Sequence, residues 1–511
     1  MSGRWMDVRD SIRSISVPEW LWANGATTAA VIGTSLLLPV LFLQQGSDTY
    51  RSILLAYSLL TLGGFGAIVW TRMVQSDPPT MGMQTRLLPI LFLALTIRLI
   101  AAHSPGFDFD LTVNKGWAQS AAQLGLARSY DEQLGGNVLP NYPPLMITLY
   151  WATGTLYKFA LSPAFDALLP DYGIVIRFPA IVADLAACVV VAMVARRAGL
   201  HRKWAWVALA YALHPVVIYD TGVWGQSDGI YALWMLLALY ALACKRWFWV
   251  GAWTACALLT KPQAAAMLPV LLLVLVRNLP RTVSFFGGAF LAGLATLFPF
   301  IAGGTLGAVL AVYQRTIGGY YKAVSIGAYN FWTIFHGIAE RSDEDIALGV
   351  VTFRAAGLLL FAVATMLVLW RLRRSLIFPC NERQHLIGVL LAGALTTSAM
   401  FIFCTEMHER YQFAFVLLAL PAAAVSGAAA ILYGATSCLI LLNLLAEFPL
   451  GSVDAAFFNM LPALPKVIGA MQVVLFLVAV KMAPEIADTQ SGGNNGESSP
   501  ALPGACRGHR P

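Results

Sequence analysis

Two carboxylates, Asp108 and Asp110, stand in the segment GFDFDLTVNKGW, directly after a hydrophobic stretch of the chain. A carboxylate at a membrane boundary can act as a general base that takes a proton from a hydroxyl, which contributes roughly 10²- to 10⁴-fold in rate. Asp110 can equally be the N-cap of a helix that rests on lipid. Asp108 can assist Asp110 or hold a metal ion. The segment therefore predicts either a catalytic base or an ordinary helix start.

Amide, carboxylate and aromatic groups occur together farther along the chain. Tyr142 precedes a rigid Pro-Pro pair, and Trp224, Gln226 and Asp228 lie in the segment VWGQSDG. A short hairpin at the membrane interface explains the Trp and the glycines, but it does not require Gln226 or Asp228. A sugar with several hydroxyls favours amide and carboxylate partners beside an aromatic face. We therefore expect Tyr142, Trp224, Gln226 and Asp228, together with Asp108, to contact a substrate.

Two clusters supply cationic groups. Lys261 and Gln263 lie in TKPQ, inside an apolar stretch, where a charge costs about 2.5–3.5 kcal/mol at mid-bilayer and marks a functional site unless the side chain snorkels to the interface. His408 and Arg410 lie in EMHERY, and a guanidinium can grip two phosphate oxygens. We expect these four residues to bind a lipid phosphate. The spacing in EMHERY differs from that of the zinc motif HExxH, so no metal ligand is predicted.

Three other features carry weaker expectations. The segment SIGAYNFW covers residues 325–332, and Arg98 lies near the end of a hydrophobic stretch. Arg177 and Asp184 are seven residues apart in RFPAIVAD. This spacing predicts that the two charges pair across two turns of one helix.

The composition indicates a membrane protein. Hydrophobic residues make up 58% of the 511 residues and charged residues only 12%, where a soluble protein has roughly 25% charged residues. The formal charge of +7 comes from Lys and Arg in short connectors, which argues against nucleic acid as a partner. The seven cysteines are scattered without metal-ligand spacing.

Apolar runs long enough to cross about 30 Å of hydrocarbon recur along the chain. They predict an all-α polytopic membrane protein with about fourteen transmembrane helices. The stretch 247–277 is interrupted by Lys261-Pro262 and can be two short spans or one kinked element. The predicted spans are approximately 26–43, 52–71, 87–103, 174–195, 204–220, 229–244, 247–260, 263–277, 282–302, 347–370, 385–404, 411–432, 433–450 and 464–481.

The positive charges predict the orientation. If the N-terminus is cytoplasmic, the Lys- and Arg-rich connectors share the cytoplasmic side, and every candidate site residue falls on the outer side. Two long outer connectors follow, at about 104–173 and 303–346. The first is expected to carry surface helices near 110–128 and 145–160.

The expected organisation has four parts. Residues 1–86 form a cytoplasmic N-terminus and two additional spans, and 87–415 form a catalytic core. Residues 416–484 form C-terminal spans. Residues 485–511 are rich in Gly, Ser, Pro and Asn and are expected to be a disordered cytoplasmic tail. The protein is thus expected in the cell membrane as a multi-pass protein with both termini in the cytoplasm.

In this order, the segments resemble the GT-C superfamily of polytopic glycosyltransferases that use polyprenyl-phosphate sugars. The likeness is nearest to bacterial mannosyltransferases related to the enzyme that adds the second mannose of GPI anchors. The chain also looks like the dolichyl-phosphate-glucose-dependent glucosyltransferases of N-glycan assembly. Asn141 stands where family members often carry an acidic residue. The matching segments, from about residue 87 to 415, are DLTVNKGW, YPPL, RFPAIVAD, VWGQSDG, LLTKPQ, AYNFW and MHERY.

The resemblance implies that Asp110 is the catalytic base of a hexosyltransferase acting on the outer face, with mannose favoured over glucose. The partners would be a polyprenyl-phosphate sugar, a lipid- or glycan-linked acceptor and membrane lipids. We expect an inverting displacement that requires no cofactor, although Asp108 and Asp228 leave room for a divalent metal.

Two other classes of protein stay open on the sequence alone. A transporter or lipid flippase suits many spans, intramembrane charge and the broken stretch at 247–277. A lipid-linked polymerase or ligase shares a membrane groove and an outer loop. The transporter lacks support from an inverted repeat, and its charges would be expected at the midplane of the membrane.

Overall fold

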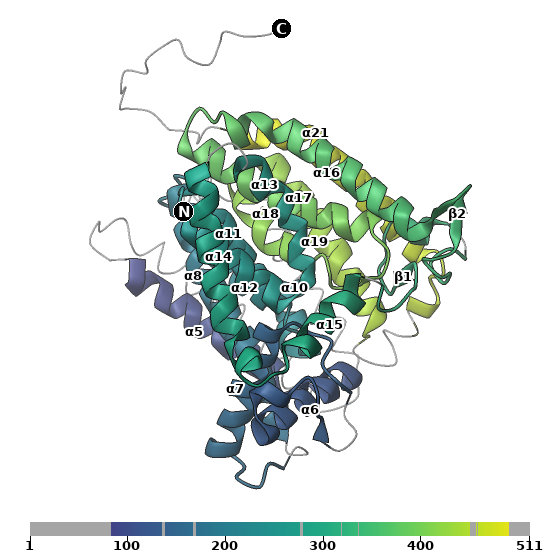
Figure 1. The fold of residues 1–511 in the computed structure, drawn as a ribbon. Helices are drawn as coiled ribbons and strands as arrows, with labels where there is room; N and C mark the ends of the chain where they lie inside the picture. Colours follow the sequence, from purple (N-terminus) through teal and green to yellow (C-terminus); the bar gives the residue numbers. More distant parts are fainter. Residues whose placement is uncertain are drawn as a thin grey trace, which may run out of the picture.

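The structure is a computed structural model that describes residues 83–489, except 135–137, 167–169, 276–278, 318, 336, 450–455 and 457. The predicted spans at 26–43 and 52–71 and residues 490–511 of the predicted tail lie outside the described residues. The chain is mainly helical, and most helices form one bundle (Figure 1). The helices are α5 (Met83–Ala101), α6 (Asp108–Leu124), α7 (Pro144–Ala160), α8 (Pro170–Arg197), α9 (Trp204–Ala212), α10 (Pro215–Val217), α11 (Asp228–Ala243), α12 (Trp247–Thr260), α13 (Leu268–Leu275), α14 (Leu279–Ala302), α15 (Leu306–Ile317), α16 (Phe353–Ile377), α17 (Glu382–Phe403), α18 (Phe413–Val425), α19 (Gly427–Glu447) and α21 (Leu464–Asp488).

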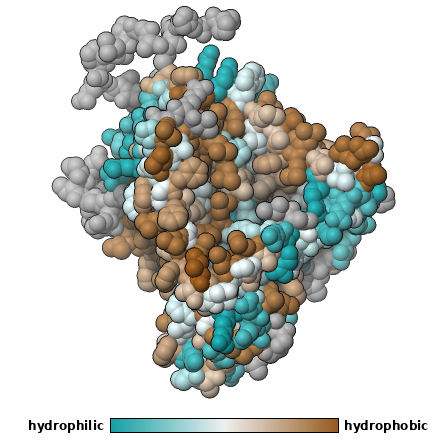
Figure 2. All heavy atoms as spheres, viewed as in Figure 1, coloured by the Kyte–Doolittle hydropathy of each residue, from teal (hydrophilic) through white to brown (hydrophobic). Residues whose placement is uncertain are grey.

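Among the described residues, six helices are long and apolar enough to cross a membrane: α8, α14, α16, α17, α19 and α21. This supports the prediction of an all-α membrane protein. The same helices differ in how much they are covered, since the apolar window of α17 is fully buried whereas only 17% of that of α14 and 28% of that of α16 is buried. Figure 2 shows hydrophobic side chains over much of the bundle surface. Such exposed apolar faces are expected where a protein meets lipid.

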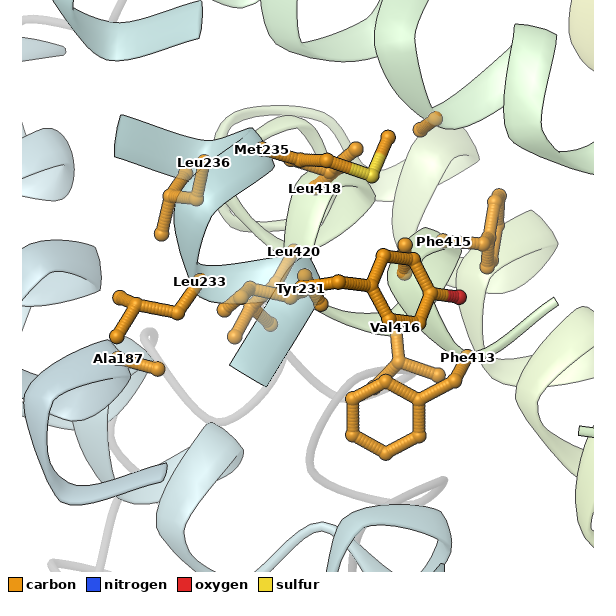
Figure 3. Packing of buried hydrophobic residues seen from close by; sticks show 14 of the residues in the cluster. Ala187, Tyr231, Leu233, Met235, Leu236, Phe413, Phe415, Val416, Leu418 and Leu420 are labelled. Atoms are coloured by element: carbon orange, nitrogen blue, oxygen red, sulfur yellow. The ribbon is translucent and has the colours of Figure 1, made fainter. Parts of the chain in front are cut away.

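The core of the bundle forms around α11, α17 and α18. Apolar side chains on α11 interlock with those on α18, and α8 closes the cluster (Figure 3). The cluster adjoins the polar loops that precede α11 and α18, so its packing fixes the position and rotation of the first turn of both helices. Its labelled members are Ala187, Tyr231, Leu233, Met235, Leu236, Phe413, Phe415, Val416, Leu418 and Leu420.

Several helix boundaries differ from the predicted ones, and the alternatives left open for the stretch 247–277 are decided. The predicted spans 411–432 and 433–450 meet instead at Ser426, whose hydroxyl accepts a hydrogen bond from the Ala429 amide and caps α19. The last helix continues to Asp488 instead of ending near 481. The stretch 247–277 is broken, because Lys261 is extended and Pro262 starts a 3₁₀ segment, η4 (Pro262–Met267).

The first long connector carries the two helices that were predicted there. They are α6 and α7, with a short 3₁₀ turn, η1 (Leu126–Arg128), between them. Helices α6 and α7 pack on each other at one end of the bundle (Figure 1).

The second connector runs to Thr352 and not to 346, because α16 begins at Phe353 and not at the predicted 347. It contains short strands that the sequence did not predict. Strand β1 (Ser325–Ile326) pairs in parallel with β4 (Met407–His408), and β2 (Ile346–Leu348) forms an antiparallel hairpin with β3 (Val351–Thr352). The segment 325–332 is anchored by side-chain hydrogen bonds. Asn330 donates to the Phe401 carbonyl at 3.0 Å, and Trp332, in the 3₁₀ segment η5 (Phe331–Ile334), donates to the Phe403 carbonyl at 2.9 Å. SIGAYNFW therefore docks this connector on the end of α17.

Candidate active site

A cavity of about 300 Å³ lies where α6, the start of α7, η4, α16 and the loop between α17 and α18 meet. It has charged groups at two places, Asp110 with Lys261 and Arg410, and Asp343 with Arg354 and Glu406. Between them the wall is aromatic and apolar. The remaining lining residues are Phe109, Val113, Asn114, Trp117, Asn141, Tyr142, Pro262, Gln263, Gly319, Tyr320, Tyr321, Leu358, Met400, Cys404, Thr405, Met407 and Tyr411.

Asp110 is positioned by groups that all meet one of its oxygens. Oδ2 accepts hydrogen bonds from the Trp224 indole at 3.0 Å and the Gln226 amide at 2.5 Å, and it lies 3.8 Å from Nη2 of Arg410. Within the part of the chain that the structure describes, Oδ1 accepts no hydrogen bond. Asp110 is the third residue of α6, and Phe107 occupies the N-cap position. The alternative that Asp110 is a plain N-cap is therefore wrong.

A π-helix, η3 (Ile218–Trp224), delivers the Trp and the amide to Asp110. Such wider turns often occur at functional sites. The Asp220 carbonyl accepts hydrogen bonds from the Gly225 and Gln226 amides, which closes the turn after the π-helix. Gly225 has φ of +92°, and a Cβ there would meet the Arg177 guanidinium at 3.0 Å. Only glycine combines this backbone conformation with so close an approach.

Lys261 and Asp228 form an ion pair of 2.9 Å beneath Asp110, and both side chains are buried. The break between α12 and η4 places Lys261, and the first turn of α11 places Asp228. The Lys261 ammonium also lies 5.1 Å from the centre of the Tyr142 ring, which is a favourable cation–π distance. Lys261 thus points into the protein, and the alternative that it snorkels to the interface is wrong.

Arg410 is enclosed by three carboxylates. It donates to Glu409 through Nη1, and its other nitrogens lie 3.8 Å from Asp110 and 3.9 Å from Asp228. Burial alone would raise the pKa of the Glu409 carboxyl, but the charge of Arg410 and the His408 ring, 3.7 Å away, outweigh burial and lower that pKa to about 2. Glu409 is therefore ionised at neutral pH and holds the guanidinium beside Asp110.

A second ionic cluster lines the far side of the cavity. Arg354, in the first turn of α16, donates to both oxygens of Asp343, at 2.8 and 2.9 Å, and to Glu406 at 3.2 Å. Glu406 also accepts hydrogen bonds from the consecutive amides of Tyr320, Tyr321 and Lys322. This cluster ties the second connector to the start of α16 and holds the two tyrosines at the cavity.

The structure brings most of the predicted site residues together. Asp110, Tyr142, Lys261, Gln263 and Arg410 line the cavity. Trp224, Gln226 and Asp228 lie behind this wall as hydrogen-bond or ion-pair partners of Asp110 and Lys261.

Two predicted site residues stand apart from the cavity lining. Asp108 is exposed at the start of α6. The His408 ring packs edge-on against Tyr321 and Tyr411 and lies 3.7 Å from Glu409. The described residues contain no group of three His, Cys, Asp or Glu side chains that could hold a metal ion.

Arg177 and Asp184, which were predicted to pair with each other, are satisfied by other partners. Asp184 forms a fully buried ion pair of 2.7 Å with Arg98 on α5. Arg177 donates instead to backbone carbonyls of Ala102, Ser104, Gly173 and Val223. Its guanidinium thereby fastens the loop after α5 to the end of the π-helix.

Sequence reasoning also missed Glu409, Asp343 and Arg354 as parts of the site. Glu409 could have been found, because it adjoins Arg410 in a motif already singled out. Asp343 lies in an ordinary polar connector and Arg354 lies near the start of a predicted span, and only the fold brings the two together at the cavity. Compared with known proteins, the chain matches no protein-family model and has no significant match among curated proteins.

Proposed function

We propose that this chain is an integral membrane glycosyltransferase that moves a hexose, with mannose favoured, from a polyprenyl-phosphate sugar to a hydroxyl acceptor. The observation that carries the proposal is the placement of Asp110, Lys261 and Arg410 on one cavity that borders apolar surface. Leu358 on α16 and Phe109 on α6 line the same cavity and are 55% and 69% exposed. A lipid-linked phosphate needs this combination of cations and an apolar approach.

In the proposed reaction, Oδ1 of Asp110 takes the proton of the acceptor hydroxyl. The acceptor oxygen forms a bond to the anomeric carbon as the bond from that carbon to the phosphate oxygen breaks. One displacement of this kind inverts the anomeric centre. The leaving group is a phosphate monoester, already a weak base, so the scheme needs one carboxylate and not the pair that glycosidases use.

The cations of the site have a supporting role in this scheme. Arg410 and Lys261 would balance the charge that develops on the phosphate inside a cavity with little water. Trp224 and Gln226 hold the Oδ2 side of Asp110, which leaves Oδ1 for the acceptor. Gln263, whose Oε1 has no hydrogen-bond partner among the described residues, is available for a sugar hydroxyl.

The proposal extends to the architecture and the location. We assign the chain to the GT-C type, with about fourteen transmembrane helices, both termini in the cytoplasm and the cavity on the outer face. The convergence of loops that were predicted on one side of the membrane supports this assignment, since Asp110 and Arg410 come from two such loops and lie 3.8 Å apart.

The test is hexose transfer by the purified protein from synthetic polyprenyl-phosphate mannose and, separately, from the glucose analogue. Asp110→Asn keeps the size of the side chain and removes the base, so kcat should fall roughly 10²- to 10⁴-fold. Asp131→Asn changes an exposed carboxylate in the same connector and should leave turnover unchanged. Wild-type turnover by Asp110→Asn would reject the assignment of the base.

The same preparation separates an enzyme from a transporter or flippase. The protein is reconstituted into vesicles, and movement of the lipid-linked sugar across the bilayer is followed without any acceptor. An enzyme of the proposed kind causes no movement in this assay and produces glycosylated acceptor once the acceptor is added. Movement that persists in Asp110→Asn, with no transfer in the wild type, would favour the transporter.

A further inference from the structure

The hairpin of β2 and β3 carries an apolar tip that no other part of the described chain covers. Ile346, Leu348 and Val350 are 60%, 81% and 94% exposed. Figure 1 shows the hairpin extending from the end of α16, away from the bundle, and Figure 2 shows the same tip as a hydrophobic patch next to a polar surface.

No contact within the described part of the chain offsets the free-energy cost of exposing this tip to water. The two strands contain three and two residues, and only two residue pairs are in register. An isolated hairpin of two strands is marginally stable in water. The base of the hairpin is polar, with Arg341 paired to Asp345 at 3.1 Å. The hairpin is therefore amphipathic along its length, with a polar base and an apolar tip.

The connection to α16 sets the level of the hairpin in the membrane. Helix α16 has 25 residues and is about 37 Å long, which exceeds the ~30 Å of hydrocarbon. Its ends therefore reach the two interfaces. The ion pairs of Arg354 with Asp343 and Glu406 mark the polar boundary in its first turn. Since β3 ends at Thr352, one residue before α16, the hairpin lies at this same boundary.

The apolar surface of the hairpin also continues a face that already points outward on α16. That face covers the middle of the helix, from Leu358 to Trp370, and is made of side chains that are 38–62% exposed. Its members are Leu358, Leu359, Val363, Met366, Leu367 and Trp370. A helix of this composition that crosses a membrane presents such a face to lipid.

We propose that the tip of the hairpin, residues Ile346–Leu348 and Val350, inserts into the acyl-chain boundary of the nearer leaflet and anchors the second connector to the lipid. The ligand is a bilayer surface. Phe353 donates its amide to the Asp345 carbonyl and Arg354 donates its amide to the Asp343 carbonyl, so the anchor is joined rigidly to the cavity wall. The inference does not depend on which reaction the cavity performs.

The test places an environment-sensitive fluorophore at Val350→Cys in the full chain, in nanodiscs. Cys380, which is exposed, and Cys506, which lies outside the described residues, are first replaced by Ser, and the labelled background protein gives the blank. Glu340→Cys, an exposed polar position in the same connector, is the matched control. Each sample is titrated with a water-soluble quencher and, separately, with lipids that carry a quencher near the top of the acyl chain.

The label at residue 350 should lose most of its emission to the lipid quencher and little to the soluble one, and the label at residue 340 should show the reverse. Quenching of both labels mainly from water would overturn the proposal. Protection of residue 350 from both quenchers would also overturn it, because protein and not lipid would then cover the tip. A monomer–dimer analysis of that sample would show whether the cover is a second copy.

Discussion

At the scale of single residues, the site depends on two charged side chains, Asp110 and Arg410. In each of them, different atoms have different roles. Oδ2 of Asp110 is held by an indole, an amide and a nearby guanidinium, whereas Oδ1 is left for chemistry. Arg410 is held in turn by Glu409. Without Glu409, Arg410 would still have two carboxylates within 4 Å, but among the described residues it would lose the one carboxylate to which it donates a hydrogen bond.

Glu409→Gln should change how stability depends on pH. The folded pKa of Glu409, about 2, lies below the ordinary value of 4.5, so this group stabilises the fold above pH 4.5 and loses that contribution as the pH falls toward 2. The Gln variant should have a lower unfolding midpoint at neutral pH and lack this part of the acid-dependent loss. Thermal unfolding in detergent from pH 7 to pH 2 measures both effects.

The control for that comparison is Glu382→Gln. Glu382 is 78% exposed in its pair with Arg197, and a pair of that kind contributes about 0–1 kcal/mol. Glu382→Gln should therefore shift the curve of unfolding midpoint against pH slightly at most. If the unfolding midpoint of Glu409→Gln falls with pH as steeply as that of the wild type over the whole acid range, the assigned role of Glu409 is wrong.

The sequence predicted much of the site because its charged residues are rare in an apolar chain. Lys261 and Arg410 stand out against hydrophobic neighbours, and the structure places both at the cavity. The ion-pair partner of a charged residue was harder to predict than the place of that residue in the site. Asp184 pairs with Arg98, 86 residues away, and helical spacing along one segment cannot detect a partner on another helix.

At the scale of elements, α12 and α14 pack closely through a glycine on each helix. A Cβ at Gly251 would lie 1.8 Å from the Phe285 carbonyl oxygen, and one at Gly288 would lie 1.9 Å from the Phe248 carbonyl oxygen. Small residues that let backbones approach are the usual means of helix association in lipid. This contact supports the side of the bundle that ends in Lys261.

Gly288→Ala should therefore force α12 and α14 apart and destabilise the protein by about 1–3 kcal/mol, the usual cost of overpacking. Gly287→Ala is the matched control, since a Cβ at that neighbouring position meets nothing within 4 Å. The unfolding midpoint in detergent should fall for Gly288→Ala only. Equal midpoints for the two variants would show that the helices do not pack as described.

Helix positions were predictable from the sequence, and several boundaries were not. The apolar runs predicted the locations of α8, α14 and α17, because length and hydropathy alone decide whether a helix can span lipid. The break between α18 and α19 depends on the local cap at Ser426, which has little effect on hydropathy. The short strands of the second connector depend on partners far away in the chain, such as Met407 for Ser325.

At the scale of the whole molecule, loops that were predicted on the same side of the membrane lie together. Arg197, at the end of α8, forms a salt bridge of 2.9 Å with Glu382, at the start of α17, and both belong to predicted cytoplasmic loops. Asp110 and Arg410 link two predicted outer loops. The pairing of loops agrees with the charge pattern, and which set faces the cytoplasm is a prediction.

Labelling with a membrane-impermeant thiol reagent checks that orientation. Cys380 is exposed between α16 and α17 in a predicted cytoplasmic loop. With Cys506 replaced by Ser, Cys380 should react only after the membrane is permeabilised. Glu340→Cys, in a Cys380→Ser and Cys506→Ser background, should react in sealed right-side-out vesicles. The opposite pattern would invert the topology and place the cavity in the cytoplasm.

The ion pair of Arg98 with Asp184 has a consequence for how the protein is assembled. The two charges reach the membrane on helices α5 and α8, which are made at different times. At roughly 5–20 residues per second, the separation of 86 residues corresponds to about 4–17 s of synthesis. During that interval Asp184 is not available to Arg98, so we expect this part of the core to pack only after α8 has been made.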